Sequence, residues 1–454
     1  MKIMIDGFNL ALAQGTGIAT YARNLTFNLK ALGHEVHVLY GLSRAPTRLA
    51  IMREIAFYDE PVPRGVIQRV FEPIRRTLEL ISAVLGPLSG YEVPISETII
   101  KRQLAPRMPS FDKLWNVPNL FDRAHRAFHY FGRRPSVNPG CPIQLMHWTY
   151  PLPARVKGAA NIYTLHDLVP LRLPYTTLDD KFVYYKLVQA IAREADHIVT
   201  VSENSKRDIV TLLGVPETKV TNTYQAIDIP SSYLNLSIEE LESELKGSFR
   251  LQYKNYLLSY GAVEPKKNVG RIIEAYLSSN INKPLVIAGA SAWKSDEELR
   301  LLAGLNGERL LRMRRIIRVP YLSFAQLVNL IRGATAVVFP SLYEGFGLPI
   351  LESMVCGTPV ITSNIGSMKE IAGDAALLVD PYNTREIKDA IIAMVSNNSL
   401  QSQKSALGQK VAARYSSERY RDRLDTLYET IAKQQSHGDM KRLNVATKTG
   451  RRAV

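Results

Sequence analysis

Residues 336–352 read AVVFPSLYEGFGLPILE, and they decide the fold that the sequence predicts. Four apolar residues are typical of a short buried strand, and two glycines in the loop after it, Gly345 and Gly347, let the backbone approach a ligand closely. Pro349 suits the first turn of a helix because its missing N–H would be unpaired there anyway. The stretch therefore predicts a strand, a loop and a helix N-terminus that can bind an anionic group at the carboxyl end of a parallel sheet.

Two carboxylates accompany this loop. Glu344 lies within it and Glu352 stands one turn into the helix, so both can face one crevice. A carboxylate accepts two hydrogen bonds in a defined plane, which suits the hydroxyl groups of a sugar or a ribose. The alternative is a strand–turn–helix whose glycines serve packing and whose glutamates are solvated. The length of the string favours a binding site.

The same alternation of strands and helices runs through the rest of the chain. In the second half the expected strands are the apolar runs 256–260, 285–288, 316–319, 359–362 and 377–379. In the first half they are 2–6, 36–40, 143–147, 161–165 and 197–201. Helical patterns separate the strands in both halves, and such an alternation predicts open parallel sheets. We therefore expect an α/β protein with two Rossmann-like domains.

We place the first domain at 1–233 and the second at 234–415. Within the first domain, 43–142 is rich in proline and arginine and shows no clear alternation, so we expect an irregular basic insertion there. A helical pattern covers 416–433. Residues 434–454 are polar and basic without periodicity, which predicts a disordered tail.

The composition indicates a globular protein with an anionic partner. The 454 residues include 57 Lys and Arg against 42 Asp and Glu, and the net charge of +15 attracts phosphates of any kind. Zinc-finger spacings, aromatic RNA-binding signatures and basic heptad helices are absent from the sequence, so nucleic acid is the weaker choice. The apolar runs fall short of the ~18 residues that span a bilayer, and the N-terminus lacks a signal-peptide pattern. Two cysteines are too few for a disulfide framework, so we expect a cytoplasmic protein.

One basic segment has helical periodicity. In 66–88 the apolar residues fall at steps of three and four, and Pro73 is expected to divide the segment into two helices. The arginines that flank the apolar stripe are Arg64, Arg69, Arg75 and Arg76. The simpler interpretation is that the stripe packs on the first sheet. The other is that it binds the anionic inner face of a membrane, where each basic residue adds ~1 kcal/mol and the protein would be peripheral.

Taken together, these motifs resemble the retaining GT-B glycosyltransferases of carbohydrate-active family 4, in particular a mannosyltransferase-like group. Residues 344–352 are similar to the family's pair of glutamates separated by seven residues, and 259–268 (SYGAVEPKKN) to its Gly-x-x-x-Glu-Pro-Arg-Lys-Asn segment. Three other similar segments are 166–168 (HDL), 201–206 (VSENSK) and 354–362 (MVCGTPVIT).

The resemblance covers most of 256–395, the first forty residues and about 161–227, and it leaves 43–142, roughly a quarter of the chain, unmatched. It implies two domains that face a central cleft, with the acceptor side in the first, the donor side in the second, and a C-terminal helix that crosses back onto the first.

The resemblance also implies a donor site in the second domain. It places Lys267 on the donor diphosphate, where a cation stabilises the charge that builds on the departing group. Many members have arginines where this chain has Ala262 and Lys266, so diphosphate binding would depend more on Lys267, helped by Lys266. The inferred donor-binding residues are Gly261, Lys266, Lys267, Tyr321, Glu344, Gly345, Phe346, Gly347, Leu348 and Glu352.

In the first domain, His166 matches a histidine that lines the cleft near the transferred sugar. With Glu344 and Lys267 it makes up the expected catalytic set, and we expect it to position the sugar. The loop Gly15-Thr16-Gly17 before the first helix has room for an acceptor anion or the donor diphosphate, and a plain strand-to-helix turn is an equal alternative. It is not a dinucleotide fingerprint, because the third glycine is missing.

The implied reaction moves a hexose, with retention of configuration, from a nucleotide sugar to a saccharide or lipid-linked saccharide, in bacterial-type polysaccharide or glycolipid assembly. GDP-mannose is the expected donor and a UDP-hexose the alternative. The first half shows no obvious carboxylate nucleophile, so we expect a front-face substitution in which the departing phosphate takes the acceptor proton. No cofactor or metal is expected, since an Asp-x-Asp cluster is missing. Other classes left open are a sugar-nucleotide epimerase, an NAD-dependent dehydrogenase and a non-catalytic sugar-binding protein.

Overall fold

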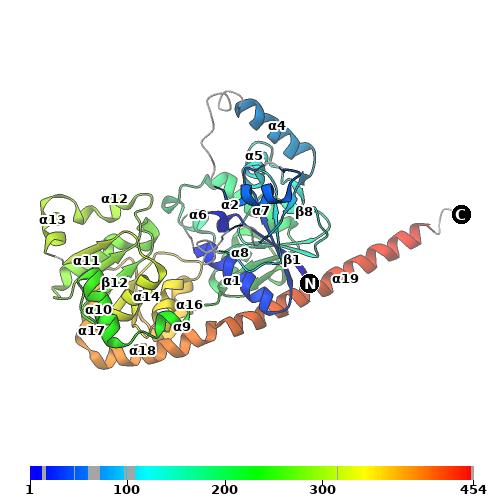
Figure 1. Cartoon of the computed structure of the whole chain (residues 1–454). Coiled ribbons are helices and arrows are strands. Elements are labelled where there is room, and N and C mark those ends of the chain that lie inside the picture. The colour runs from blue at the N-terminus through cyan, green and yellow to red at the C-terminus, as the bar shows by residue number, and fades with distance from the viewer. Residues whose placement is uncertain are drawn as a thin grey trace.

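The residues that the computed structural model describes are 1–12, 17–44, 46–59, 72–96, 99, 108–313 and 315–450, without the side chains of 72 and 435–450. They form two α/β domains side by side, with a long C-terminal helix along both (Figure 1). Each domain contains a sheet of predominantly parallel strands, which confirms the predicted fold class.

The first domain is built on a sheet with the strand order β11-β10-β9-β7-β1-β2-β5-β4, eight strands in the described part of the chain. The strands are β1 (Lys2–Asp6), β2 (Glu35–Tyr40), β4 (Tyr91–Val93), β5 (Lys113–Asn116), β7 (Leu145–Trp148), β9 (Ala160–Thr164), β10 (His197–Thr200) and β11 (Val220–Asn222). β4 runs antiparallel to β5 at the edge, and the inner strands are parallel. These inner strands are apolar and buried on both faces because helices cover both sides of the sheet.

The helices of this domain are α1 (Gly17–Ala31), α2 (Ala50–Tyr58), α4 (Glu72–Leu85), α5 (Leu120–Phe131), α6 (Val169–Arg172), α7 (Lys181–Glu194) and α8 (Glu203–Leu213). The sequence defines both ends of α8. The hydroxyl of Ser202 accepts the N–H of Ser205 at 3.0 Å and so caps the helix, and Gly214 ends the helix with φ 65°. A second, small parallel sheet consists of β3 (Leu88–Ser89), β6 (Ser136–Asn138) and β8 (Arg155–Val156), and β3 follows α4 in the chain.

The second domain has a parallel sheet with the order β14-β13-β12-β15-β16-β17. Its strands are β12 (Leu257–Tyr260), β13 (Leu285–Ala288), β14 (Ile316–Val319), β15 (Ala336–Phe339), β16 (Val360–Ser363) and β17 (Leu377–Val379). Its helices are α9 (Ser231–Leu234), α10 (Ile238–Glu244), α11 (Val269–Ser279), α12 (Ser295–Glu298), α13 (Gly304–Arg312), α14 (Phe324–Gly333), α15 (Leu348–Val355), α16 (Gly366–Ala372), α17 (Thr384–Ser396) and α18 (Asn398–Ala412). The strand order reverses direction between β12 and β15, which is where open α/β sheets bind ligands.

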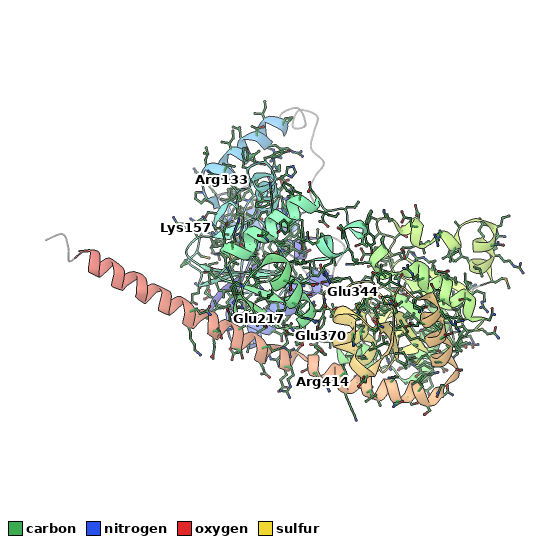
Figure 2. The ribbon with its side chains drawn as sticks, turned by 180° about the vertical axis from the view of Figure 1, so that it is seen from behind. Arg133, Lys157, Glu217, Glu344, Glu370 and Arg414 are labelled. Carbon is green, nitrogen blue, oxygen red and sulfur yellow. The ribbon has the colours of Figure 1, made fainter. Side chains whose placement is uncertain are left out.

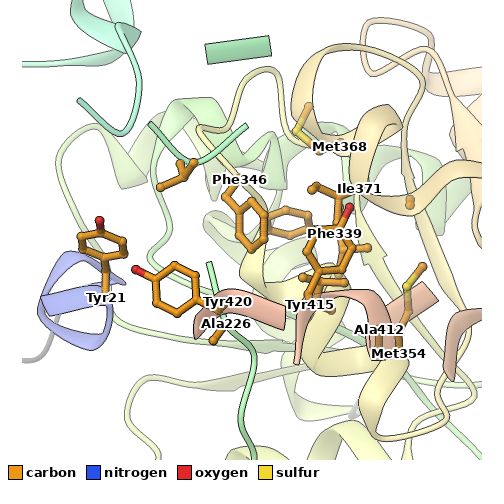
Figure 3. Packing of buried hydrophobic residues seen from close by; sticks show 14 of the residues in the cluster. Tyr21, Ala226, Phe339, Phe346, Met354, Met368, Ile371, Ala412, Tyr415 and Tyr420 are labelled. Atoms are coloured by element: carbon orange, nitrogen blue, oxygen red, sulfur yellow. The ribbon is translucent and has the colours of Figure 1, made fainter. Parts of the chain in front are cut away.

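The last helix, α19 (Ser417–Gly450), ties the two domains together. It packs on α1, where Arg421 donates to Asn28 at 3.3 Å. The cluster of buried apolar residues in Figure 3 contains Tyr21 of the first domain, Phe339 of the second and Tyr420 of α19. The two sheets therefore share one continuous core.

The structure differs from the expected chain organisation in two places. The tail expected to be disordered from 434 continues as helix to Gly450. Its start is already fixed by packing, and adding residues to an existing helix costs far less than nucleating one. The insertion expected to be irregular contributes β5 to the main sheet and α5 to its cover. These short elements are flanked by polar and proline-rich residues, so their sequence pattern is weak. β5 depends on pairing with β2.

The segment 66–88 lies partly outside the described residues. Its second part is α4, with Pro73 in the first turn, and the part before Glu72 is not described. The interpretation that the apolar stripe packs on the sheet is wrong for α4. Ile74, Leu78 and Leu85 are 59%, 62% and 80% exposed, and the helix contacts α5 with its other face.

Candidate active site

The motif that opened the sequence analysis forms a strand, loop and helix beside the centre of the second sheet. β15 is wholly buried between β12 and β16, and α15 follows with Pro349 in its first turn. Gly347, the residue before the helix, has φ 106°, a conformation that favours glycine over residues with a Cβ. The N–H groups of the first turn of α15 therefore start at the carboxyl end of the sheet, as predicted.

The loop after β12 brings Lys267 to this motif. Nζ of Lys267 lies 2.6 Å from Oε1 of Glu344, and the two residues are 77 positions apart in sequence. Asn268 holds the loop in place: it has φ 62°, and its amide donates to the carbonyl oxygens of Pro340 at 3.0 Å and Pro381 at 2.7 Å. The N–H of Leu342 also donates to the carbonyl of Lys266 at 2.8 Å. The two predicted donor segments are thus one structural unit.

The charges of this unit are mostly buried. The side chains of Lys267 and Glu344 are 16% and 11% exposed. Burial opposes the ionisation of Glu344, but Lys267 and then Lys266 outweigh it, so the pKa of the carboxyl lies below its ordinary value. Lys266 also faces Glu264 at 3.5 Å. Two lysines and two glutamates therefore balance one another at the end of the sheet.

Glu352 has a different environment. It accepts a hydrogen bond from the hydroxyl of Tyr260 at 2.9 Å, and that hydroxyl also lies 2.9 Å from the carbonyl of Pro349. Burial raises the pKa of Glu352, and the hydrogen bond from Tyr260 and the charge of Lys267 offset this only in part. The pKa values of the two glutamates of the motif are thus shifted in opposite directions. This suits a charged role for Glu344 and a hydrogen-bonding role for Glu352.

The first domain contributes His166, which follows β9. Its Nε2 donates to the carbonyl of Thr149 at 3.0 Å, and the ring of Tyr21 meets the imidazole edge-on at 4.7 Å. Burial lowers the pKa of His166, against the opposing effects of the Thr149 carbonyl and Asp167. The imidazole is therefore neutral at pH 7 and held in one orientation, which fits a positioning role better than proton transfer.

The two domains touch at the motif loop. A Cβ on Gly345 would lie 2.6 Å from the carbonyl oxygen of His166, so a residue with a side chain would push the two loops apart. The hydroxyl of Ser205 donates to the carbonyl of Gly345 at 3.3 Å, and Tyr343 donates to Asp208. Gly345 therefore serves the close approach of the two domains.

A second contact between the domains lies nearby. Oε1 and Oε2 of Glu370 accept the N–H groups of Glu203 at 2.8 Å and Asn204 at 2.9 Å, at the start of α8. Figure 2 shows Glu344 and Glu370 where the two domains meet. Glu370 and Asp208 could not be singled out from the sequence, because their roles depend on which loops the two sheets bring together.

Some predicted site residues lie elsewhere. The ring of Phe346 is buried against Tyr224 and Tyr415, so its side chain belongs to the core (Figure 3). Tyr321 is 78% exposed beyond β14, the edge strand. Gly15 and Thr16 lie outside the described residues, and Gly17 is the first residue of α1.

The other predicted donor residues gather around the Lys267–Glu344 pair. Gly261 and Lys267 line a small pocket together with Tyr260 and Phe339, and Leu348 begins α15. Among the described residues, no group of three or more His, Cys, Asp and Glu side chains is arranged to hold a metal ion.

Comparisons with known proteins identify the family. A family model described as Glycosyltransferase Family 4 matches residues 15–229, and one described as Glycosyl transferases group 1 matches residues 243–411. O-antigen chain mannosyltransferase B of Escherichia coli is 32% identical over 270 residues, which are 58% of this chain and 68% of that protein. The chain is a family 4 glycosyltransferase.

This glycosyltransferase has relatives along most of its length. It is 25% identical over 390 residues to MMP alpha-(1->4)-mannosyltransferase of Mycolicibacterium hassiacum, covering 82% of the chain and 84% of that protein. The structure of Anabaena Alr3699/HepE in complex with UDP and glucose superposes with a TM-score of 0.61 at 14% identity, covering 95% of this chain and 100% of that one. That likeness shows the fold, GT-B.

Proposed function

We propose that the enzyme transfers mannose from GDP-mannose, with retention of configuration, to a saccharide or lipid-linked saccharide. The observation that supports a nucleotide-sugar donor is the Lys267–Glu344 pair at the end of the second sheet. Lys267 and the N–H groups of α15 are suited to a diphosphate, and Glu344 to sugar hydroxyls. Donor binding then exchanges an internal ion pair for two contacts with the ligand.

The departing diphosphate gains charge as the sugar bond breaks. A buried lysine and fixed N–H groups stabilise that charge without having to reorganise during the reaction. His166, neutral and held by Thr149, orients the sugar from the opposite domain. In a front-face substitution an oxygen of the departing phosphate takes the proton of the acceptor hydroxyl, so no basic side chain is needed.

Mannose is favoured because two relatives, each matched by this chain over two thirds or more of its length, are named mannosyltransferases. A UDP-hexose is the second candidate, since a protein of the same fold binds UDP and glucose. The test measures release of nucleoside diphosphate from GDP-mannose and from UDP-glucose by the full chain. GDP release with a saccharide acceptor supports the proposal. UDP release alone would assign the second candidate, and sugar-nucleotide isomerisation without release would assign an epimerase.

Retention is tested separately on the product. Anomeric NMR of the new linkage should show the configuration of the donor, and mass spectrometry of the enzyme during turnover should show no attached hexose. A hexose attached to Asp167, the carboxylate beside Gly345, would replace the front-face substitution with a double displacement.

The proposed location is the cytoplasmic surface of an anionic membrane. Within the described residues, no helix combines the length and the apolar character that crossing a bilayer requires. α4 instead presents an exposed stripe, Ile74, Leu78, Ile81 and Leu85, at the top of the first domain in Figure 1. Tyr130 and Phe131 at the end of α5 are also exposed.

The opposite face of α4 is held in place, so the stripe is fixed outward. Glu79 contacts Arg126 at 3.3 Å and Asn119 at 3.0 Å, and Arg123 donates to Ser82 at 2.6 Å, all from α5. Arg76 of α4 and Arg133, which follows α5, are exposed basic residues in this part of the first domain (Figure 2 labels Arg133). An apolar face with basic flanks suits an interface with anionic headgroups.

Liposome co-sedimentation tests the location. The enzyme should bind vesicles containing phosphatidylglycerol, bind more weakly in high salt, and ignore pure phosphatidylcholine. The double variant Ile74→Ser/Leu78→Ser and the variant Arg76→Glu should each lose binding. Leu305→Ser should not, because Leu305 is even more exposed but lies in the second domain. An enzyme that ignores anionic vesicles at low salt would refute the location and leave the donor reaction untouched.

A further inference from the structure

Aromatic side chains gather at the carboxyl edge of the first sheet, next to His166. Phe8 follows β1, and its ring stacks on Tyr150, which follows β7, with centroids 5.8 Å apart and planes at 23°. Phe121 meets the other side of Phe8 edge-on at 5.1 Å. This packing fixes the plane of the Tyr150 ring, which is half-buried.

The position of Tyr150 relative to the reacting groups is also fixed. The carbonyl of Thr149, the preceding residue, accepts the hydrogen bond from His166. Tyr184 of α7 donates from its hydroxyl to the carbonyl of Asp167 at 3.3 Å. Because Asp167 also lies against Gly345, these aromatic residues stand on the first-domain side of the contact with the donor motif.

Two carboxylates are close enough to these hydroxyls to act on their pKa values. Burial, followed by the charges of Asp179 and Asp167, raises the pKa of Tyr150 to about 12, with Lys266 opposing. Burial likewise raises the pKa of Tyr184, with Asp167, the Tyr150 hydroxyl and Asp179 adding to the effect. The neighbouring cation, Lys266, belongs to the second domain and is already matched by Glu344 and Glu264. The electrostatic balance around the two tyrosines is therefore negative.

This combination has a chemical meaning. An aromatic face packs against the C–H face of a pyranose ring, and carboxylate and phenol groups exchange hydrogen bonds with its hydroxyls. The same negative charge disfavours a phosphate group. Phosphate oxygens and an ionised carboxylate are both negative and both accept hydrogen bonds, so they repel each other and form no hydrogen bond.

We propose that Tyr150, Tyr184, Asp167 and Asp179 form the subsite for the terminal sugar of the acceptor, and that this sugar is neutral. The subsite lies in the first domain, opposite the Lys267–Glu344 pair, so a hydroxyl of the bound sugar faces the donor. This inference rests on the proposed function for its role in transfer, but the binding it requires can be measured without turnover. A phosphate on the acceptor would have to lie farther from the cleft, beyond this sugar.

Saturation-transfer difference NMR on the full chain tests the binding. The probe is methyl α-mannopyranoside at millimolar concentration, since single sugars bind weakly. The wild type should give a signal on the ring protons, and Lys267→Met should keep it, because the donor site is separate. Tyr150→Ala should abolish the signal, and Asp179→Asn and Tyr184→Phe should each reduce it several-fold. Tyr185→Phe is the matched control, because Tyr185 is the next residue of α7 but is exposed and accepts from Gln189.

A separate NMR experiment tests the preference of the subsite for a neutral sugar. In the Lys267→Met background, mannose 6-phosphate should give a weaker signal than methyl α-mannopyranoside. An equal or stronger phosphate signal, or a mannoside signal that survives both Tyr150→Ala and Asp179→Asn, would overturn the subsite. Asp179→Asn changes an exposed side chain and should fold normally, so it decides the matter if Tyr150→Ala does not fold.

Turnover separates this inference from the proposed function. In turnover with a saccharide acceptor, Asp179→Asn should raise the acceptor KM, whereas the control Tyr185→Phe should leave both the acceptor KM and the slow hydrolysis of GDP-mannose unchanged. Mannoside binding with no turnover of any nucleotide sugar would refute the function and keep the subsite. Normal turnover with an unchanged acceptor KM in Asp179→Asn and Tyr184→Phe would refute the subsite and keep the function.

Discussion

Replacing Lys267 by methionine isolates the charge of the donor site. Nζ of Lys267 contacts Glu344 at 2.6 Å and lies 4.9 Å from the ring centroid of Phe339. Methionine keeps an unbranched apolar stem of similar length over that ring, so the packing stays and the cation is lost. The variant therefore tests the ion pair and the diphosphate contact without opening a cavity.

The expected loss of activity is large and the expected loss of stability moderate. Removing one group that stabilises developing charge costs about 100-fold or more in kcat/KM, or about 2.7 kcal/mol. Breaking a fully buried ion pair costs about 3–5 kcal/mol, and a surface pair is worth at most about 1 kcal/mol. Here Lys266 stays close enough to Glu344 to lower its pKa, so we expect a loss of about 1–2 kcal/mol in the free energy of unfolding.

The measurements are initial rates of nucleoside diphosphate release and urea unfolding. Lys388→Met is the control, because Lys388 of α17 pairs with Asp389 at 3.4 Å in a partly exposed position away from the motif. It should change both quantities little. A folded Lys267→Met enzyme with kcat/KM within five-fold, on the order of 1 kcal/mol, of the wild type would refute the role of Lys267.

Four further outcomes follow from the same site. Glu352→Gln should raise the donor KM and leave kcat nearly unchanged, because Tyr260 can still donate to the amide oxygen; kinetics showing a lower kcat at constant KM would contradict this. Gly345→Ala should lower kcat by about ten-fold or more while calorimetry shows the same donor affinity, since the new Cβ would lie 2.6 Å from the His166 carbonyl; unchanged kcat would mean that the domains need not approach. The pKa of Glu344 in the folded protein lies below 4.5, so the stability from its pair with Lys267 is present above that pH and lost as the pH falls through the folded pKa. In urea unfolding, the difference in unfolding free energy between wild type and Lys267→Met should shrink in that pH range. A difference that persists in acid would be inconsistent with the pair. We also propose that turnover needs no metal, so the rate should survive EDTA, and a loss that Mg²⁺ restores would disprove this.

Much of the fold could be predicted because it depends on local sequence. Apolar runs such as 336–339 and 285–288 are buried strands, as the sequence predicted. Glycines and prolines fixed the turn into α15 in the same way. Short strands with polar flanks, such as β5, escaped because their stability comes from pairing with β2 and not from their own composition.

The site residues also fall into two groups: those that could be singled out from the sequence and those whose contacts only the tertiary structure shows. The glutamates and glycines of 344–352 could be singled out from the sequence by their type and spacing, and Lys267 through the resemblance to family 4, and their role in donor binding stays a proposal. Only the tertiary structure decided that Lys267 pairs with Glu344, that the ring of Phe346 belongs to the core, and that the stripe of α4 faces outward. The reason is physical: local conformation follows from neighbouring residues, whereas these contacts depend on sheet order and on how closely two domains approach, which no short segment encodes.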